Sequence, residues 1–385
     1  MKLHLFLLIF VLILIFQPKA QAQPLSPNAT ISILTCNPGE EVYSMYGHTA
    51  IRVNDPVQGI DVVYNYGVFS FETPDFIYRF AKGQTDYLMV GQKFGSFLPE
   101  YVEDKRSVYE QVLNLSPEGK TLLFQALIEN AKPQNREYRY NFFIDNCATR
   151  VRDMIERNSG SPVRFTDNHP TESYRDLIKK FHHSFRWTDL GIDLLIGKKA
   201  EEPVSAYGQM FLPEYLMDQF ARAEITLEGK TQPLVQETRT LLEYPNSKLN
   251  TGLPWPAIVF AVFFLIVLGI TVRSYLLKKK TYWLDYVLFA LSGLAGIIIG
   301  WFTLYSEHPA LSPNYNLLWA FPLNLVFVGF WAIKKWRPIT GNYFWLAGGV
   351  LLLSLVTGQP FNPGVYFLIL TLLVRVGVNL IQEKR

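Results

Sequence analysis

The sequence predicts an α+β domain outside the membrane, followed by an all-α bundle of five transmembrane helices. The 385-residue chain changes near residue 254 from a mixed composition to a mostly apolar one. Before that point, short β-branched runs alternate with segments of helical period. After it come apolar runs close to the length of about 20 residues that crosses a bilayer. The net charge of +3 is nearly neutral and predicts no nucleic-acid partner.

The first residues have the pattern of a secretory signal peptide. Lys2 precedes an apolar run that ends at Phe16, and Ala20-Gln21-Ala22 has the small residues of a cleavage site. We therefore expect residues 1–22 to be a signal peptide and residues 23–225 to form an exported domain. Residues 226–254 begin as a polar, strand-like stretch, and we expect them to connect that domain to the first span.

The membrane domain, residues 255–385, contains five apolar runs. They lie near residues 255–277, 283–304, 317–333, 343–356 and 364–381. Basic segments such as Lys278-Lys279-Lys280 alternate with loops that lack lysine and arginine, and the positive-inside rule places the basic segments in the cytoplasm. This predicts a multi-pass inner-membrane protein with a periplasmic N-terminal domain and a cytoplasmic C-terminus. Arg375, inside the last run, is expected to snorkel to the surface.

Alternating β-branched runs in the exported domain predict strands. They cover residues 29–34, 49–53, 60–66, 87–90 and 107–115, and the second and third form a hairpin. Ser116 and Pro117 predict the start of a helix that runs to Ala131, because serine caps helices and proline fits the first turn. Helical spacing predicts further helices over residues 147–158 and 171–181.

A cysteine stands at the start of the helix predicted over residues 147–158. Asn146 is a good N-cap residue and Gly160 a good stop signal, which places Cys147 in the first turn. The positive end of the helix dipole is expected to lower the pKa of this thiol and to favour the nucleophilic thiolate. The sequence therefore predicts a reactive cysteine here, provided that a base lies nearby.

The candidate base is His48, which stands at the start of a predicted strand. A third residue would orient its imidazole, and Asn65 is the first choice and Asp61 the second, because the two share one face of the next strand. Arg52 shares a strand face with His48. We expect Arg52 to bind either a substrate phosphate or a structural carboxylate.

The second cysteine of the exported domain, Cys36, leaves an alternative open. Exported domains often contain disulfides, so Cys36 could pair with Cys147 and consume the proposed nucleophile. In the other interpretation, Cys36 is a small buried apolar residue near the site.

Two motifs resemble a known family. Residues 46–53, Tyr-Gly-His-Thr-Ala-Ile-Arg-Val, precede residues 145–150, Asp-Asn-Cys-Ala-Thr-Arg. This order, with His before Cys, resembles circularly permuted papain-like domains, which include the lecithin:retinol acyltransferase-like relatives of the NlpC/P60 hydrolases. The chain is more similar still to the Lnb-type lipoprotein N-acyltransferases, which join such a domain to C-terminal spans. Matching landmarks extend through residues 187–197 and 308–319.

The resemblance implies an acyltransferase that uses no cofactor and no metal. Cys147 would attack a phospholipid ester and form a thioester, with His48 as the base. The acceptor would be the N-terminal amine of a diacylglyceryl-cysteine lipoprotein. The candidate substrate-binding residues are Arg52, Asp145, Asn146, His308 and Asn316.

Two other functions remain open from the sequence. The same Cys–His pair could serve a membrane-tethered cysteine peptidase or amidase that acts on cell-wall peptides. Alternatively, the exported domain could be a disulfide-bonded sensor or scaffold without catalytic activity. Release of lysophospholipid, cleavage of peptide bonds, or neither would distinguish the three.

Overall fold

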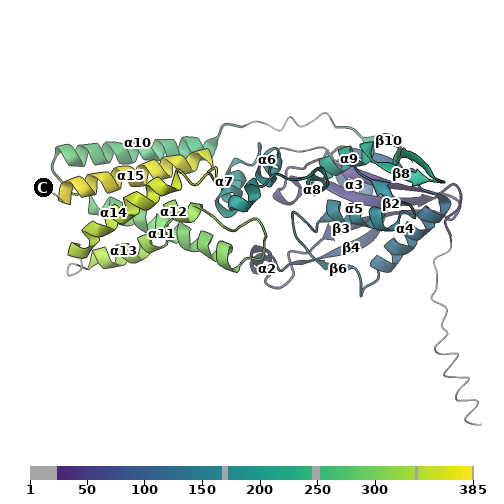
Figure 1. Ribbon diagram of the computed structural model, residues 1–385, viewed down its shortest axis with the longest axis horizontal. Helices are drawn as coiled ribbons and strands as arrows, with labels where there is room; N and C mark the ends of the chain where they lie inside the picture. Colours follow the sequence, from purple (N-terminus) through teal and green to yellow (C-terminus); the bar gives the residue numbers. More distant parts are fainter. Residues whose placement is uncertain (1–23, 167–171, 245–251, 334–336, 384–385) are drawn as a thin grey trace, which may run out of the picture.

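A computed structural model describes residues 24–166, 172–244, 252–333 and 337–383. The molecule is elongated, with a β-sheet domain at one end and a bundle of long helices at the other (Figure 1). The predicted signal peptide lies outside the described residues. The sheet followed by apolar helices agrees with the predicted α+β domain and helical membrane domain.

The core of the first domain is a seven-stranded antiparallel sheet. The strand order is β10-β5-β1-β2-β3-β4-β6, and every pairing is antiparallel. All five predicted strands are confirmed, as β1 to β5. The strands are β1 (Thr30–Cys36), β2 (His48–Asp55), β3 (Ile60–Val68), β4 (Asp86–Lys93), β5 (Val108–Leu113), β6 (Glu137–Arg139) and β10 (Val235–Leu242).

The predicted connector is wrong over its first half. Residues 226–242 contribute to β8 (Glu224–Leu227), β9 (Lys230–Pro233) and β10, and β10 pairs with β5 at the edge of the main sheet. β8 also pairs with β7 (Val163–Arg164) in a small second sheet. The exported domain therefore extends to Leu242, beyond the predicted boundary at residue 225.

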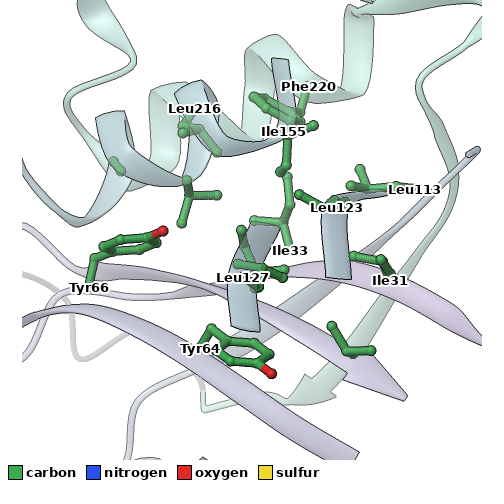
Figure 2. Packing of buried hydrophobic residues seen from close by; sticks show 14 of the residues in the cluster. Ile31, Ile33, Tyr64, Tyr66, Leu113, Leu123, Leu127, Ile155, Leu216 and Phe220 are labelled. Atoms are coloured by element: carbon green, nitrogen blue, oxygen red, sulfur yellow. The ribbon is translucent and has the colours of Figure 1, made fainter. Parts of the chain in front are cut away.

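Helices cover both faces of the main sheet. One face packs against α4 (Pro117–Asn130), α5 (Cys147–Asn158) and α9 (Pro213–Arg222). Figure 2 shows Ile33 and Tyr64 of the strands meeting Ile155 of α5 and Phe220 of α9 in this core. The opposite face packs against α3 (Phe94–Glu103) through a smaller cluster that includes Cys36. The remaining helical segments are η1 (Val42–Ser44), α2 (Phe76–Lys82), α6 (Tyr174–Lys179), α7 (Arg186–Leu195), η2 (Lys198–Glu201) and α8 (Ala206–Gln209).

The C-terminal part of the chain is all helical. Three helices are long and apolar enough to cross a membrane, namely α10 (Trp255–Leu276), α11 (Tyr282–Tyr305) and α15 (Pro363–Glu383). Shorter apolar helices occupy the other two predicted runs. They are formed by α12 (Asn316–Trp319) with α13 (Leu323–Ala332), and by α14 (Arg337–Ser354). That these two runs also cross the membrane therefore stays a prediction.

The expectation that Arg375 snorkels is wrong. Its side chain is buried, and its guanidinium donates to both carboxylate oxygens of Asp285 at 2.7 Å and to Thr271 Oγ1 at 3.0 Å. These partners lie on α11 and α10, so the ion pair and the additional hydrogen bond of one guanidinium connect three helices. A charge inside an apolar bundle is tolerated when it is paired in this way.

Removal of one partner from this pair should destabilise the bundle. Arg375→Leu leaves the Asp285 carboxylate buried and unpaired, and should lower the free energy of unfolding by about 3 kcal/mol or more. The double variant Arg375→Leu/Asp285→Leu removes both charges and should recover most of that loss. Thermal unfolding of the detergent-solubilised protein measures both. Equal unfolding temperatures for wild type and Arg375→Leu would show that the pair contributes nothing.

Candidate active site

Cys147 is the first residue of α5, as predicted, and Asn146 is its N-cap. Asn146 Oδ1 accepts hydrogen bonds from the N–H groups of Ala148 at 2.9 Å and Thr149 at 3.0 Å. The Thr149 hydroxyl accepts in return from Asn146 N–H at 2.8 Å, which completes a capping box. The helix start that carries the thiol is therefore rigidly defined.

The sulfur of Cys147 lies where strands β2 and β3 separate. Their pairing ends at Ala50 and Asn65. Beyond that point the backbone N–H of Thr49 lies close enough to Cys147 to favour its thiolate. Gly67 passes beside the thiol in the left-handed conformation, with φ of 87°. A Cβ at that position would lie 3.6 Å from the Cys147 Cβ. The thiol thus adjoins the first residues of β2, where His48 stands.

A chain of hydrogen bonds orients His48. The Glu100 carboxylate can only accept, so it receives the amide N–H of Gln92 at 3.0 Å. Gln92 Oε1 then accepts from Asn65 Nδ2 at 3.0 Å, and Asn65 Oδ1 faces His48 Nε2 at 3.1 Å. Because each amide is fixed by the next, Nε2 carries the proton of the neutral imidazole. Nδ1 is left unprotonated.

The second choice for the orienting residue, Asp61, is bound elsewhere. Its carboxylate accepts from Arg52 Nε at 2.7 Å and Nη2 at 2.9 Å. Arg52 also donates to Glu110 at 3.1 Å, and its guanidinium lies 3.4 Å from the centre of the Phe94 ring. Of the two partners expected for Arg52, the structure shows the second, a structural carboxylate. Asn65 is the candidate that contacts His48.

The predicted lowering of the Cys147 pKa is wrong. Burial disfavours the thiolate and raises the pKa of Cys147, although N–H groups of Thr49 and Ala148 oppose the shift. Burial also lowers the pKa of His48 to about 4, against the hydrogen bond to Asn65 and with the help of the Arg106 cation. Both groups are therefore neutral near pH 7. The pair is suited to general-base catalysis, in which the thiol loses its proton as it attacks.

Comparison with protein-family models gives two matches. Residues 16–180 match the model described as the Lnb N-terminal periplasmic domain, and residues 248–385 match the Lnb transmembrane domain. The chain belongs to the Lnb family. Searches of curated proteins and of solved structures give no match. Lnb membership supports a membrane protein with a periplasmic N-terminal domain and an association with lipoprotein acylation.

Two candidate substrate-binding residues next to Cys147 make structural contacts. Asn146 is buried, and its Nδ2 donates to the carbonyls of Phe142 and Phe211, each at 2.8 Å. Asp145 forms a bidentate ion pair with Arg150, whose guanidinium lies 4.1 Å from the centre of the Tyr138 ring. Asn146 has no polar side-chain group left for a substrate, whereas Asp145 is partly exposed.

The two candidates in the membrane domain, His308 and Asn316, connect the domains. Asn316 is buried and donates to the carbonyl of Asp193 at 3.1 Å, while its Oδ1 accepts from Trp319 Nε1 at 2.8 Å. His308 Nε2 donates to the carbonyl of Phe80 at the end of α2, at 3.0 Å. His308 is partly exposed, while Asn316 is not placed to meet a ligand.

Both cysteines are free thiols in this structure. Cys36 is buried in the cluster beneath α3 and pairs in register with His48 across β1 and β2. Burial raises the pKa of Cys36 to about 12, so it is an inert thiol at neutral pH. The geometry favours the second interpretation of Cys36, a small buried residue near the site.

Sequence reasoning missed Tyr138 as a residue of the site. Its side chain is buried, and in the described part of the chain its hydroxyl has no hydrogen-bond partner. The hydroxyl lies 3.9 Å from the Cβ position at Gly67, beside Cys147. Burial is the main reason that the pKa of Tyr138 is raised, and the nearby Cys147 raises it further. An unpaired buried hydroxyl costs about 1–3 kcal/mol, which suggests a role in function.

A second missed cluster stands just before β2. His182 is buried, its Nδ1 donates to Asp189 Oδ1 at 2.8 Å, and in its neutral form Nε2 accepts from the Tyr46 hydroxyl at 2.7 Å. Asp189 also accepts from Asn362 of the membrane domain at 3.1 Å. No local pattern in the sequence identifies this cluster, because Tyr46 and Asn362 lie far from His182 and Asp189 in the chain. Within the described residues, no group of three His, Cys, Asp or Glu side chains forms a metal site.

The raised pKa of Cys147 predicts a specific pH dependence of its alkylation. Because the thiolate is scarce below its pKa, the rate with iodoacetamide should rise about tenfold per pH unit from pH 6 and still rise at about pH 9. His48→Ala should leave this profile unchanged, because His48 is neutral over the same range. Mass spectrometry of the labelled Cys147 peptide measures the rate. A plateau that begins near pH 5 would instead reveal a preformed thiolate–imidazolium pair.

Proposed function

We propose that this protein is a lipoprotein N-acyltransferase. It moves an acyl chain from a phospholipid to the N-terminal amine of a diacylglyceryl-cysteine lipoprotein through a thioester on Cys147. The observation that carries the proposal is the position of the thiol, which lies near Thr49 at the start of β2, the residue directly after His48, in a chain of the Lnb family. The match to the Lnb transmembrane domain also supports a location in a membrane, where phospholipid acyl donors are concentrated.

The first half-reaction transfers the acyl chain to the enzyme. As Cys147 Sγ attacks the ester carbonyl, its proton passes to Nδ1 of His48, the ring nitrogen that the Asn65 hydrogen bond leaves free. A carbon–sulfur bond forms and the ester carbon–oxygen bond breaks. The imidazolium then returns the proton to the departing lysophospholipid alcohol. The ester supplies the activation, so no other reactant is needed.

The second half-reaction delivers the chain to the lipoprotein. The neutral α-amine attacks the thioester carbonyl, a carbon–nitrogen bond forms, and the carbon–sulfur bond breaks. His48 accepts the proton lost by the amine and returns it to the Cys147 sulfur. The free enzyme is restored, which predicts ping-pong kinetics.

Each half-reaction places a negative charge on the carbonyl oxygen. The backbone N–H of Cys147 is one donor for that oxyanion, as is usual at a helix start. The Tyr138 hydroxyl is the second donor, since it is buried, unpaired among the described residues and adjacent to Cys147. Asn65, with Gln92 and Glu100 behind it, positions His48.

We further infer a circularly permuted papain-like architecture, with the histidine strand before the cysteine helix. The support is the antiparallel sheet, with β2 at its centre, and the packing of α5 against it. We also propose five spans, with the C-terminus in the cytoplasm of an inner-membrane protein. The basic segments of the sequence and the three long apolar helices support this topology.

The alternatives make different predictions for the same site. A cell-wall peptidase or amidase would use the same pair on an amide. The family match favours the acyltransferase. The disulfide-bonded scaffold is less supported, because both cysteines are free thiols.

Replacement of Cys147 tests the function directly. Cys147→Ala should abolish both the third acyl chain on lipoproteins, measured by mass spectrometry of their N-termini, and Cys147-dependent release of lysophospholipid. The matched control is Cys36→Ala, which removes the buried thiol and should keep activity. Persistence of the third chain in the Cys147→Ala strain would refute the proposal. Cys147-dependent cleavage of cell-wall peptides, without lysophospholipid, would support the peptidase.

Tyr138→Phe tests the oxyanion donor. It should lower the rate of thioester formation about 100-fold, as expected for the loss of one oxyanion-hole donor. It should not lower the unfolding temperature, because the hydroxyl lost has no partner in the described structure. The neighbouring Tyr66 is the control, since its hydroxyl donates to Asn130 at 2.6 Å. Tyr66→Phe should lose about 1 kcal/mol of stability and keep activity. A wild-type rate for Tyr138→Phe would exclude this role.

A further inference from the structure

An exposed apolar segment projects from the exported domain after β3. This segment, residues 69–80, includes the first five residues of α2 and no buried residue. Phe69 and Phe76 stack within it, with ring centres 5.4 Å apart, and Phe69 also stacks on Tyr87 of β4. Other side chains point to solvent: Ile77 is 82% exposed and Phe71 68%, while Tyr78 and Phe80 are also exposed. A contiguous patch of this kind usually marks an interaction surface.

The end of α2 is fixed to the helical bundle. The Ser306 hydroxyl donates to the Ala81 carbonyl at 2.8 Å, Glu307 N–H to Lys82 O at 2.9 Å, and His308 Nε2 to Phe80 O at 3.0 Å. Residues 306–308 directly follow α11, a helix long enough to span the membrane. Figure 1 shows α2 between the sheet and the bundle. The segment thus stands at the depth of the membrane surface.

The apolar surface continues from the segment onto α11. The Tyr78 ring lies 6.0 Å from the Trp301 ring, centre to centre. Leu304 and Tyr305, at the end of α11, are exposed as well. Aromatic side chains at the ends of spans are typical of the bilayer interface, and Lys82 supplies a cation of the kind common on interfacial helices.

The other end of the segment follows the part of β3 that passes the thiol. Gly67, two residues before Phe69, runs beside Cys147, with 3.6 Å between its Cβ position and the Cys147 Cβ. The segment therefore follows, at one end, the strand that passes the proposed nucleophile and contacts, at the other end, the residues at and just after the end of α11. A phospholipid acyl chain is long, flexible and apolar, and it needs an apolar surface when its ester leaves the bilayer.

We propose that residues 69–80 are seated in the outer leaflet and form the surface along which a phospholipid acyl chain reaches Cys147. The delivery step rests on the proposed function. The seating in the leaflet does not. The surface selects its occupant by apolar contact, so it fits a lipid chain within the leaflet that surrounds α11.

The first experiment tests the seating without activity. In a Cys147→Ala background, Ile77→Cys is labelled with a nitrobenzoxadiazole fluorophore, and the full chain is reconstituted in phosphatidylethanolamine/phosphatidylglycerol vesicles. The matched control is Val57→Cys on the β2–β3 hairpin, where the native side chain is 67% exposed. Lipids with a nitroxide near the head group should quench the label at position 77 about threefold and leave the label at position 57 unchanged. Equal quenching at both positions would overturn the seating.

The second experiment tests delivery. Ile77→Asp, at a side chain too exposed to matter for folding, should slow acylation of Cys147 from vesicle phospholipid at least about tenfold, since a carboxylate is costly in the interface. Acylation by a water-soluble p-nitrophenyl butyrate should stay at the wild-type rate. Val57→Asp should affect neither reaction.

The outcomes separate the two proposals. A wild-type rate for Ile77→Asp with vesicles would overturn delivery, whatever the fluorescence shows. An equal loss with both donors would also overturn it, because the change would then act on the chemistry. If the wild-type enzyme forms no thioester with vesicle phospholipid, the proposed function fails and delivery fails with it. The quenching result still decides the seating in that case.

Discussion

The site depends on one constraint, the point at which β2 and β3 stop pairing. Because the ladder ends at Ala50 and Asn65, the N–H of Thr49 can lie near the Cys147 sulfur, where it favours the thiolate. Left-handed Gly67 lets β3 pass the thiol without a side chain in the way. If the ladder continued for two more residues, the start of α5 would be displaced from the sheet. The capping box of Asn146 then sets the direction of the helix, so the strand end and the cap together position one sulfur atom.

Burial determines how this site can work. A thiol at a helix start has a lowered pKa only while solvation of the thiolate is not lost, and here burial outweighs the N–H donors. The same burial keeps His48 neutral, and the chain from Glu100 through Gln92 to Asn65 selects the tautomer. A buried, neutral pair suits the proposed reaction with a lipid ester, because no resting charge must be desolvated when an acyl chain enters.

Sequence patterns predicted what is encoded locally and missed what is paired at a distance. The cap at Asn146 and the alternation in the first five strands are properties of neighbouring residues, and the structure confirms both. β10 has the sequence pattern of a connector because it is a polar edge strand, and its partner β5 lies more than a hundred residues earlier. The prediction that Arg375 snorkels is also wrong because of a distant partner. Nothing near Arg375 in the sequence identifies Asp285 as that partner. Of the residues proposed for substrates, Arg52 and Asn316 turned out to hold protein groups.

The membrane domain does more than anchor the site. Asn316 and Asn314 donate to carbonyls at the end of α7, and Asn362 donates to Asp189 within the same helix. Asp189 holds His182, which in turn bonds Tyr46, two residues before His48. A tilt of the bundle would therefore strain a buried chain of hydrogen bonds that ends at the start of β2. Since a buried polar group is costly when its partner is removed, this chain keeps the two domains in one orientation. The end of α2 touches the bundle through a separate set of hydrogen bonds, so the exported domain is fixed to the bundle at two places.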